Sequence, residues 1–472
     1  MAKRIIFSML LMIFSLGPAI VEKGALAEDS SPVTTLSLSL TELTQDALKY
    51  SAKLESARLM AESTRSEANS LGAAEFPHLQ LGGTYFYDTT IPELSLSPKT
   101  PSVPFGFNNN WSANASLNFD LWDFRSLHNQ ANSAFAAYQA QDQSYEAAKR
   151  ELLLALRMEY FQVQINLEQV RLLGDSLKVA QAQYEDISHQ AKFGTASRLD
   201  SLSSHQEVLS YQRSFSQAQA NLSSSLRDLF NLAGVQEMAD FTDPMDFRMK
   251  GNLPKGVSDP SVWLSMDPED DSLKTLRTGT VAPPDDSVPQ AKTYAYLAES
   301  VRFAADASAS GLLPKLTFSA QAGYQDPIGP INQTFQQNTV SLTASMPLFD
   351  WGQILDDSDA KRKQSQAYLK NLDQAKSDLT RDWNKAQDQL RSLNFQQTIN
   401  QTAVTETDEL ARLTYSSYRA GSSKFLEVQT ANYQALNAKV QAISNEVQML
   451  MQLSVLSSLS GDSSQSTANS QK

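Results

Sequence analysis

Apolar and polar residues alternate in four segments of the chain, at about 77–90, 109–122, 314–325 and 338–349. Such alternation is typical of a β-strand with one apolar and one polar face. The second segment is the clearest, because six apolar residues there alternate with serine, asparagine and aspartate. The first is the weakest, because a pair of glycines interrupts it. Segments of about ten residues with this pattern are what the strands of a transmembrane barrel require.

Two other segments, at about 127–193 and 355–420, predict unusually long helices. They contain no proline, and Gly174 is their only glycine. At 1.5 Å per residue, about 65 residues make a rod of roughly 100 Å. Apolar residues in the first rod recur at steps of three and four, the spacing of a coiled-coil seam. Each rod is followed by a glycine turn and a shorter helix, at about 198–233 or 424–459, which predicts two antiparallel helical hairpins.

The sequence repeats itself, which indicates an internal duplication. The motif Leu121-Trp122-Asp123-Phe124 recurs as Leu348-Phe349-Asp350-Trp351, at an offset of 227 residues. Upstream of these motifs, Pro77 matches Pro314 at an offset of 237 residues. The first copy therefore holds ten extra residues, which we place in a proline-rich loop at 91–107.

The duplication divides the chain into five parts. We expect a signal peptide at 1–27, a first repeat at 28–236, an Asp/Pro-rich connector at 237–289, a second repeat at 290–460 and a disordered tail at 461–472. Each repeat is predicted to contain a helix, two strands, a long helix and a return helix.

The first residues have the pattern of a secretory signal. Lys3 and Arg4 precede an apolar run of about a dozen residues, and Ala25-Leu26-Ala27 offers a small-residue cleavage site before Glu28. After this signal no apolar run reaches the roughly 20 residues of a membrane helix, so we expect strands to make any membrane crossing. The chain contains no cysteine that could carry a lipid or form a disulfide.

The composition and the motifs exclude several function classes. With 52 acidic and 39 basic residues, the chain is too acidic for a nucleic-acid partner. His189 and His205 flank one glycine turn, but two histidines without a third ligand are a poor zinc site. The sequence contains no nucleophile elbow, phosphate loop or paired-histidine zinc motif. We therefore expect no enzymatic activity, no cofactor and no metal site.

Four strands cannot close a barrel, because known closed membrane barrels need at least eight. Open strand edges in lipid would leave backbone groups unpaired. Two chains would give a barrel filled by its own side chains, whereas three chains would give twelve strands around water. The small polar residues on one strand face suit a wet pore, so we expect a homotrimer whose long helices continue the wall as a tube.

Several landmarks in the sequence resemble the TolC-like family of outer-membrane efflux proteins. They are Leu38-Ser39-Leu40-Thr41-Glu42-Leu43, Gly311-Leu312-Leu313-Pro314, Pro347-Leu348-Phe349-Asp350-Trp351-Gly352 and Tyr418-Arg419-Ala420-Gly421. The resemblance covers nearly the whole mature chain. It implies a trimeric twelve-stranded barrel in the lipid of a Gram-negative outer membrane, continued by an antiparallel helical tunnel into the periplasm.

The resemblance also implies a function. The chain would form the exit duct of a tripartite efflux or type I secretion system and conduct substrates passively. It would dock to a periplasmic membrane-fusion (adaptor) protein and to an inner-membrane pump of the RND, ABC or MFS type. A periplasmic coiled-coil adaptor or scaffold is the alternative, because it also carries long helical hairpins. Two hairpins that are each framed by membrane strands argue against that alternative.

Finally, the resemblance places a gate at the helical tip. Asp200 matches a family aspartate that bonds across to the other hairpin, and Tyr418 matches its tyrosine partner. Glu427 lies where the family has an acidic ring, and Thr430 where a second aspartate is usual. Ser423 replaces an arginine of the family's prototype.

These assignments leave two questions open. Without the arginine the tip would lack one ionic latch, unless Arg198 or Lys424 replaces it. Asp200 and Glu427 also have a simpler explanation, because carboxylates in the first turn of a helix suit its dipole. The tip itself, and the surface that docks the adaptor, is assigned to the two turns. Its residues are Gly194, Thr195, Ala196, Gly421 and Ser422.

Overall fold

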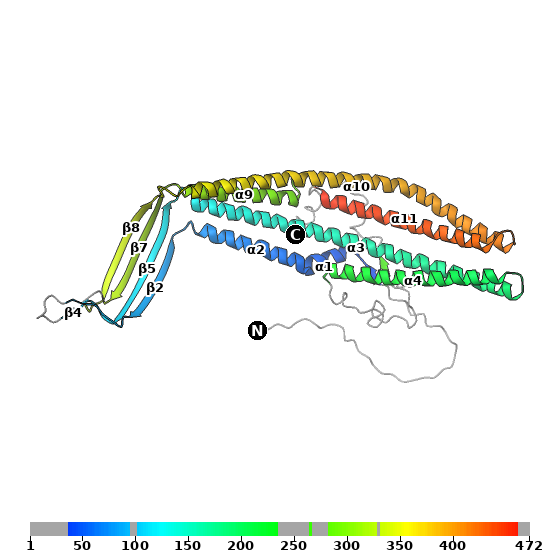
Figure 1. Ribbon diagram of the computed structural model, residues 1–472, viewed down its shortest axis with the longest axis horizontal. Helices are drawn as coiled ribbons and strands as arrows, with labels where there is room; N and C mark the ends of the chain where they lie inside the picture. Colours follow the sequence, from blue (N-terminus) through cyan, green and yellow to red (C-terminus); the bar gives the residue numbers. More distant parts are fainter. Residues whose placement is uncertain (1–35, 95–101, 235–263, 267–281, 328–330, 461–472) are drawn as a thin grey trace, which may run out of the picture.

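A computed structural model describes residues 36–94, 102–234, 264–266, 282–327 and 331–460. The expected signal peptide and tail lie outside the described residues, as does most of the connector. The molecule is long and narrow, with a sheet at one end and helices over the rest of its length (Figure 1).

The two repeats contain the same elements in the same order. The first has α2 (Ala52–Ala73), β2 (His78–Tyr87), β5 (Asn109–Trp122), α3 (Ser126–Lys192) and α4 (Arg198–Leu232). The second has α9 (Pro289–Ser310), β7 (Lys315–Asp326), β8 (Phe335–Ser345), α10 (Gln353–Arg419) and α11 (Phe425–Leu459). Corresponding helices have equal lengths of 22, 67 and 35 residues. The predicted mixed fold, with long antiparallel helical hairpins beside four strands, is confirmed.

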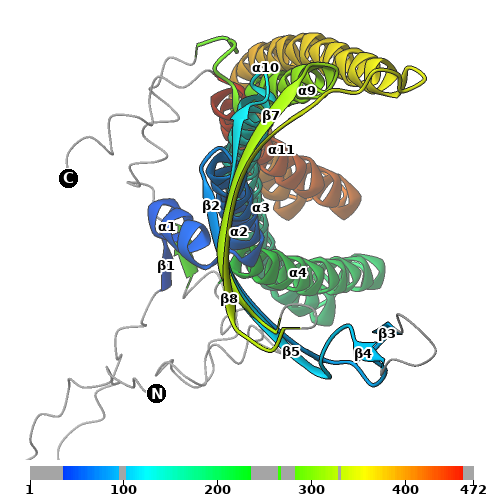
Figure 2. The ribbon, with the colours of Figure 1, turned by 90° about the vertical axis from the view of Figure 1, so that its left-hand side faces the viewer.

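The four long strands form one antiparallel sheet in the order β2-β5-β7-β8. Its strands follow a curve when the molecule is seen from the sheet end (Figure 2). Strands β2 and β8 lie at the two edges, so each has one side without a partner in the sheet. The register sets apolar residues side by side on one face, where Leu81 is 79% and Val340 72% exposed.

The other face of the sheet is polar and hydrogen-bonded. The Ser319 and Ser341 hydroxyls lie 2.7 Å apart, and the Thr317 hydroxyl donates to the Asp120 carboxylate across 2.9 Å. Lys315 also pairs with this carboxylate at 2.8 Å. The alternation seen in the sequence thus becomes two chemically distinct faces.

One strand is displaced from its predicted position. The fourth strand was expected at 338–349 and lies at Phe335–Ser345. It ends before Pro347, whose ring nitrogen cannot donate to a strand ladder. It begins earlier because Gln336 and Gln337 pair with β7, although Gln336 puts a polar side chain at a position of the apolar face.

The main apolar core lies partway along the helices. There α3 packs against α4, α11 and the short α1 (Leu40–Tyr50), and residues such as Phe161 and Leu229 are fully buried. The Tyr160 hydroxyl donates to the Leu38 carbonyl across 3.2 Å. This bond fastens the core to β1 (Leu36–Leu38), which pairs in parallel with β6 (Leu264–Met266) of the connector.

Within the proline-rich loop expected at 91–107, the described residues form a short antiparallel pair, β3 (Glu93–Leu94) and β4 (Val103–Pro104). Strand β4 lies beyond the end of the sheet farthest from the helices (Figure 1). Among the helices that the structure describes, none is both long and apolar enough to cross a membrane.

Candidate functional site at the helical tip

Each helical hairpin ends in a glycine turn at the end of the molecule opposite the sheet (Figure 1). Gly194 and Gly421 both have a φ of +77°, a left-handed conformation that glycine adopts without strain. The next residue, Thr195 or Ser422, donates its backbone N–H to the carbonyl five residues earlier, at 2.9 Å in both turns. Its hydroxyl bonds the same oxygen at 3.0 or 2.9 Å. The two turns therefore share one backbone geometry.

A small apolar cluster joins the two hairpins just behind the turns. Ile187 of α3 packs there against Phe425 and Val428 of α11, and all three side chains are buried. Tyr415, Tyr418 and Ala196 pack around this core. The rings of Tyr418 and Phe425 meet edge to face, with their centres 5.5 Å apart. Of the predicted tip residues, Ala196 is thus half-buried, while Gly194, Thr195, Gly421 and Ser422 are exposed.

Close to the tip, a hydrogen bond between the two hairpins joins Tyr415 of α10 to Asp186 of α3. The Tyr415 hydroxyl donates to Asp186 Oδ2 across 3.0 Å, and Arg419 Nε lies 3.8 Å from the same oxygen. Burial, helped by this carboxylate, raises the pKa of Tyr415 to about 12. At neutral pH the phenol therefore keeps its proton and remains a donor.

The predicted pair of Asp200 and Tyr418 is close but not bonded. No hydrogen bond links them in the described part of the chain, and the bond across the hairpins runs from a tyrosine one turn earlier. Burial raises the pKa of Tyr418, and the negative charges of Asp200 and Asp186 raise it further. The backbone N–H of Asp200 is held by the Ser197 hydroxyl at 3.0 Å, as an N-cap.

The other predicted gate residues lie around the second turn. The Ser423 hydroxyl donates to the Thr414 carbonyl at 3.3 Å, and the Thr430 hydroxyl to the Leu426 carbonyl at 2.9 Å. Both hydroxyls are thus bound to the backbone of their own hairpin. Glu427 is exposed in the first turn of α11.

Arg198 and Lys424 were the two residues expected to replace the arginine that the resemblance implies at Ser423. Within the described residues, neither Arg198 nor Lys424 takes part in an ion pair, and Arg419 makes the ion pair that crosses the tip.

A second polar layer joins the hairpins about one helical turn farther from the tip. Asn432 of α11 donates to Gln183 at 3.1 Å and to Glu207 at 3.3 Å. Gln429 donates to the Ser203 carbonyl at 3.1 Å. Burial raises the pKa of Glu207, although the two amides partly oppose this.

Sequence reasoning missed Asp186, Tyr415 and Asn432, which are among the residues that make polar contacts between the hairpins. Of these three residues, only Tyr415 could have been identified from the sequence. It lies three residues before Tyr418, a spacing that puts both rings on one face of a helix.

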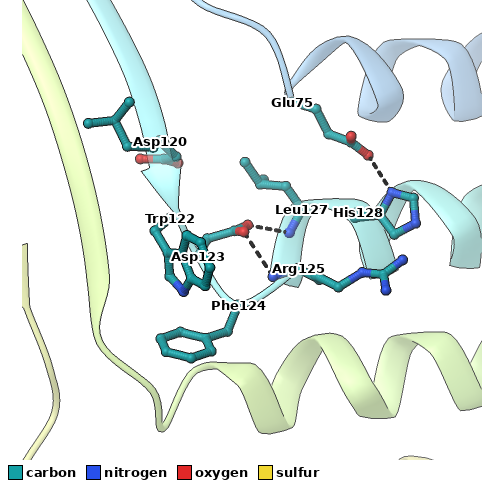
Figure 3. Close-up of a pocket in the computed structure, with 9 residues that line it drawn as sticks. Glu75, Asp120, Trp122, Asp123, Phe124, Arg125, Leu127 and His128 are labelled. Carbon is teal, nitrogen blue, oxygen red and sulfur yellow. Dashed lines mark hydrogen bonds and ion pairs between the residues drawn. The ribbon is translucent and has the colours of Figure 1, made fainter.

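The repeated Trp-Asp-Phe and Phe-Asp-Trp motifs lie at the other end of the helices, between a strand and the long helix that follows it. Figure 3 shows the first of these junctions. Asp123 accepts the N–H groups of Arg125 and Leu127 at 3.0 and 2.6 Å. Asp350 accepts the corresponding N–H groups at 3.1 and 2.9 Å. The motif therefore caps the helix.

The first junction also borders a cavity of about 360 Å³. His128 lies 3.3 Å from the Glu75 carboxylate on one side of it, and the exposed rings of Trp122 and Phe124 meet edge to face nearby. Arg125 extends along the same hollow (Figure 3).

Within the described ranges, no three histidine, aspartate or glutamate side chains gather as metal ligands.

Comparison with family models gives one match. The model of the outer membrane efflux protein family matches residues 43–235 and 295–462, so each repeat contains one matched segment. A comparison with curated protein sequences returned no match.

Solved structures with the same fold include several channels. The crystal structure of CusC has a TM-score of 0.71 and 17% identity, covering 93% of this chain and 96% of that one. The outer membrane protein VceC from Vibrio cholerae has a TM-score of 0.71 and 15% identity, covering 89% of this chain and 96% of that one. The CmeC outer membrane channel from Campylobacter jejuni has a TM-score of 0.71 and 13% identity, covering 96% and 97%. At such identities the likeness establishes the fold.

Proposed function

Because the chain belongs to the outer membrane efflux protein family, we propose that it forms the exit duct of a tripartite efflux or type I secretion system. The duct conducts substrates passively from an inner-membrane pump across the periplasm and the outer membrane, without catalysis by this chain.

The observation that carries this proposal is that one molecule has an apolar sheet surface at one end and long polar helices over the rest of its length. The sheet exposes a broad apolar face, which suits lipid. From its end run two 67-residue helices, each about 100 Å long, whose surfaces are largely polar. A membrane segment joined to a long polar extension fits a duct that crosses the outer membrane and spans the periplasm.

Assembly as a homotrimer accounts for the unpaired edges of β2 and β8. An open edge in lipid costs several kcal/mol for each unsatisfied backbone group. Three chains supply twelve strands, and the serine, threonine and asparagine of the polar face then line a wet lumen. If the chain were instead a periplasmic adaptor, the exposed apolar face of the sheet would lie in water rather than in lipid.

The helical tip is the proposed gate. Asp200 belongs to the first hairpin tip, and Tyr418, Ser423, Glu427 and Thr430 belong to the second. The bond from Tyr415 to Asp186 keeps α10 against α3. Copies of exposed Glu427 around a narrow axis would repel one another and attract cations.

The exposed parts of the two turns are the proposed docking surface for a periplasmic adaptor. Such an adaptor would connect the duct to an inner-membrane pump of the RND, ABC or MFS type. The exposed backbone and hydroxyls of Gly194, Thr195, Gly421 and Ser422 are available there, with Ala196 partly covered behind them.

Membrane fractionation and planar-bilayer conductance test this function. We expect the full chain in the outer-membrane fraction and discrete conductance steps after reconstitution. Recovery as a soluble monomer without detergent would contradict the duct and favour the adaptor or scaffold.

Glu427→Ala tests the gate separately. We expect weaker cation selectivity and weaker block by divalent cations, because the acidic ring is lost. Glu406→Ala is the matched control, since it removes an exposed glutamate of α10 farther from the tip. Equal behaviour of the two variants would remove Glu427 from the gate.

A further inference from the structure

The apolar face of the sheet ends at a bulge in β5. Residues directly opposite in an antiparallel pair lie on one face, and Trp122 lies opposite Leu316 of the apolar face because Leu121 bulges out of the register. Trp122 is 57% exposed, and its ring meets Phe124 edge to face with the centres 5.7 Å apart. Exposed aromatic rings at the end of an apolar face suit the boundary between hydrocarbon and water. In the proposed duct, this boundary lies at the junction of β5 and α3.

The cavity of about 360 Å³ lies at the same junction (Figure 3). The rings of Trp122 and Phe124 border it, as do Glu75, which follows α2, and Arg125, which precedes α3. Such a volume is at the lower end of the range for small-molecule sites. The cavity therefore combines apolar rings with an acidic and a basic side chain.

Arg125 has a free guanidinium on a strained backbone. In the parts of the chain that the structure describes, this group makes neither an ion pair nor a hydrogen bond. The φ of Arg125 is +66°, and its counterpart in the second repeat is Gly352, with a φ of +88°. A side chain in this left-handed region carries a conformational cost that glycine avoids. An arginine at such a position favours a function for its side chain.

The carboxylates around the cavity already have partners, with one exception. Asp120 pairs with Lys315, and Asp123 accepts two backbone N–H groups at the start of α3, which leaves those amides unavailable to an anion. Glu75 Oε1 lies 3.3 Å from His128 Nδ1. Within the described ranges, Glu75 Oε2 has no such partner, and the side chain is 35% exposed. Glu75 can therefore accept a further hydrogen bond.

The second repeat keeps the rings of this junction but not its charges. Phe349 and Trp351 also meet there edge to face, with ring centres 4.5 Å apart, and both are exposed. The counterparts of the acidic, basic and histidine residues of the cavity are Leu312, Gly352 and Leu355. In the described part of the chain, the charged cavity therefore occurs at one of two junctions that share their aromatic rings.

We infer that the cavity binds the headgroup of a phospholipid that carries both a phosphate and a primary ammonium. The Arg125 guanidinium donates to the phosphate oxygens, and the ammonium donates to Glu75. The acyl chains of the lipid then lie along the apolar face of the sheet, beside Trp122 and Phe124. The inference rests on the proposed position of the sheet in the outer membrane, and it adds a lipid-binding site at the periplasmic boundary.

The charges of the cavity distinguish this headgroup from two others. A glycerol phosphate headgroup would bring a negative charge beside the carboxylates without an ammonium to offset it. A choline headgroup has no N–H that it could donate to Glu75. Phosphatidylethanolamine satisfies both residues, so its affinity should exceed that of phosphatidylglycerol and phosphatidylcholine by about tenfold.

Native mass spectrometry of the full chain in detergent measures this preference. Each of the three phospholipids, with identical acyl chains, is titrated separately against the purified protein, and the bound lipids are counted. We expect saturation at one phosphatidylethanolamine per chain. Equal affinities for the three lipids would overturn the inference.

Two substitutions separate the two halves of the site. Arg125→Gly removes the guanidinium and should weaken the binding of phosphatidylethanolamine and phosphatidylcholine alike, by about tenfold. This variant should fold at least as well as the wild type, because glycine adopts a φ of +66° without strain. Glu75→Gln keeps an oxygen for His128 and should remove only the preference for phosphatidylethanolamine over phosphatidylcholine.

Arg213→Gln is the control, because it removes an exposed arginine of α4, far from the sheet (Figure 1). It should bind lipid like the wild type. If Arg125→Gly binds as tightly as this control, the inference is wrong.

Soluble phosphoethanolamine distinguishes a lipid from a free headgroup. It should not displace the bound lipid at equal concentration, because it lacks the acyl chains that lie against the sheet. Displacement at equal concentration would overturn the assignment to a phospholipid.

These outcomes are distinct from those of the proposed function. A wild-type chain that conducts in planar bilayers but shows no lipid preference would overturn the inference alone. Recovery as a soluble monomer without detergent would overturn the proposed function and the inference together.

Discussion

The two helical tips have the same backbone but different side chains. Both turn at a glycine with a φ of +77°, and in both the N–H of the next residue bonds the carbonyl five residues earlier across 2.9 Å. Yet Phe425 and Val428, buried at the second tip, correspond to Arg198 and Ser201 at the first. The second tip supplies aromatic rings, and the first supplies Asp186 and Asp200.

This difference shows how a duplicated scaffold can make a specific contact with itself. Two identical tips would present identical surfaces, and two sets of ionised carboxylates would repel each other. After divergence, a phenol on one hairpin donates to a carboxylate on the other. The two tips therefore share one backbone conformation, and the contact between them depends on the side chains in which they differ.

The largest difference in stability between the two tips is expected for the substitution Phe425→Ala. Because the ring is 1% exposed, its loss should lower the free energy of local opening at the tip by about 3–5 kcal/mol. Hydrogen exchange of the backbone amides around both turns measures this. The counterpart Arg198→Ala should change exchange little, since Arg198 is exposed. Similar effects of both substitutions would mean that the tips are energetically alike.

Substitutions of the two turn glycines should instead have equal effects on the stability of the tips. Gly194→Ala and Gly421→Ala each place a Cβ in a left-handed conformation, at a cost of about 1–2 kcal/mol, although no atom lies in the way. Hydrogen exchange at each turn should accelerate to the same extent. A clearly larger effect at one turn would show that the backbone equivalence does not extend to energetics.

Tyr415→Phe removes the bond to Asp186 and keeps the ring. We expect the tip to lose about 0.5–1.5 kcal/mol and the channel to open more often in planar bilayers. Tyr433→Phe is the matched control, because that ring is 63% exposed on α11. If both variants conduct like the wild type, the crossing bond does not hold the tip closed.

A smaller effect should appear in alkaline solution. Burial raises the pKa of Tyr415 to about 12, whereas a phenol in an opened tip titrates near 10. The protonated phenol therefore stabilises the closed tip fully below about pH 10, and this contribution is lost as the pH rises through about 12. The tyrosinate absorbance lost in Tyr415→Phe should titrate near pH 12. A lost component that titrates near pH 10 would contradict a closed, bonded Tyr415.

Most of the fold follows from periodicity in the sequence. Strict alternation located β5, and the absence of proline located the 67-residue helices, because such patterns repeat over many residues. The shift of β8 shows the limit of this reasoning. Gln336 and Gln337 join the strand through backbone pairing, which an apolar pattern does not record.

The polar contacts at the tip were much harder to predict. Asp186 is one of 52 acidic residues, and nothing near it in the sequence marks it as the acceptor from Tyr415. Its partner lies 229 residues away and meets it only because both long helices have the same length. The family resemblance placed the gate near the second turn, but the crossing bond lies one turn away from the expected Tyr418.

The equal lengths of the corresponding helices have an evolutionary consequence. Adding one heptad to α3 alone would move its turn by about 10 Å from the turn of α10 and break every contact between the tips. Adding it to α3 and α4 would lengthen only one hairpin. Insertions and deletions are therefore tolerated only when all four helices change together. The length of the helical hairpins would therefore change only rarely, when all four helices gain or lose the same number of residues. Single substitutions at the tips can accumulate one at a time.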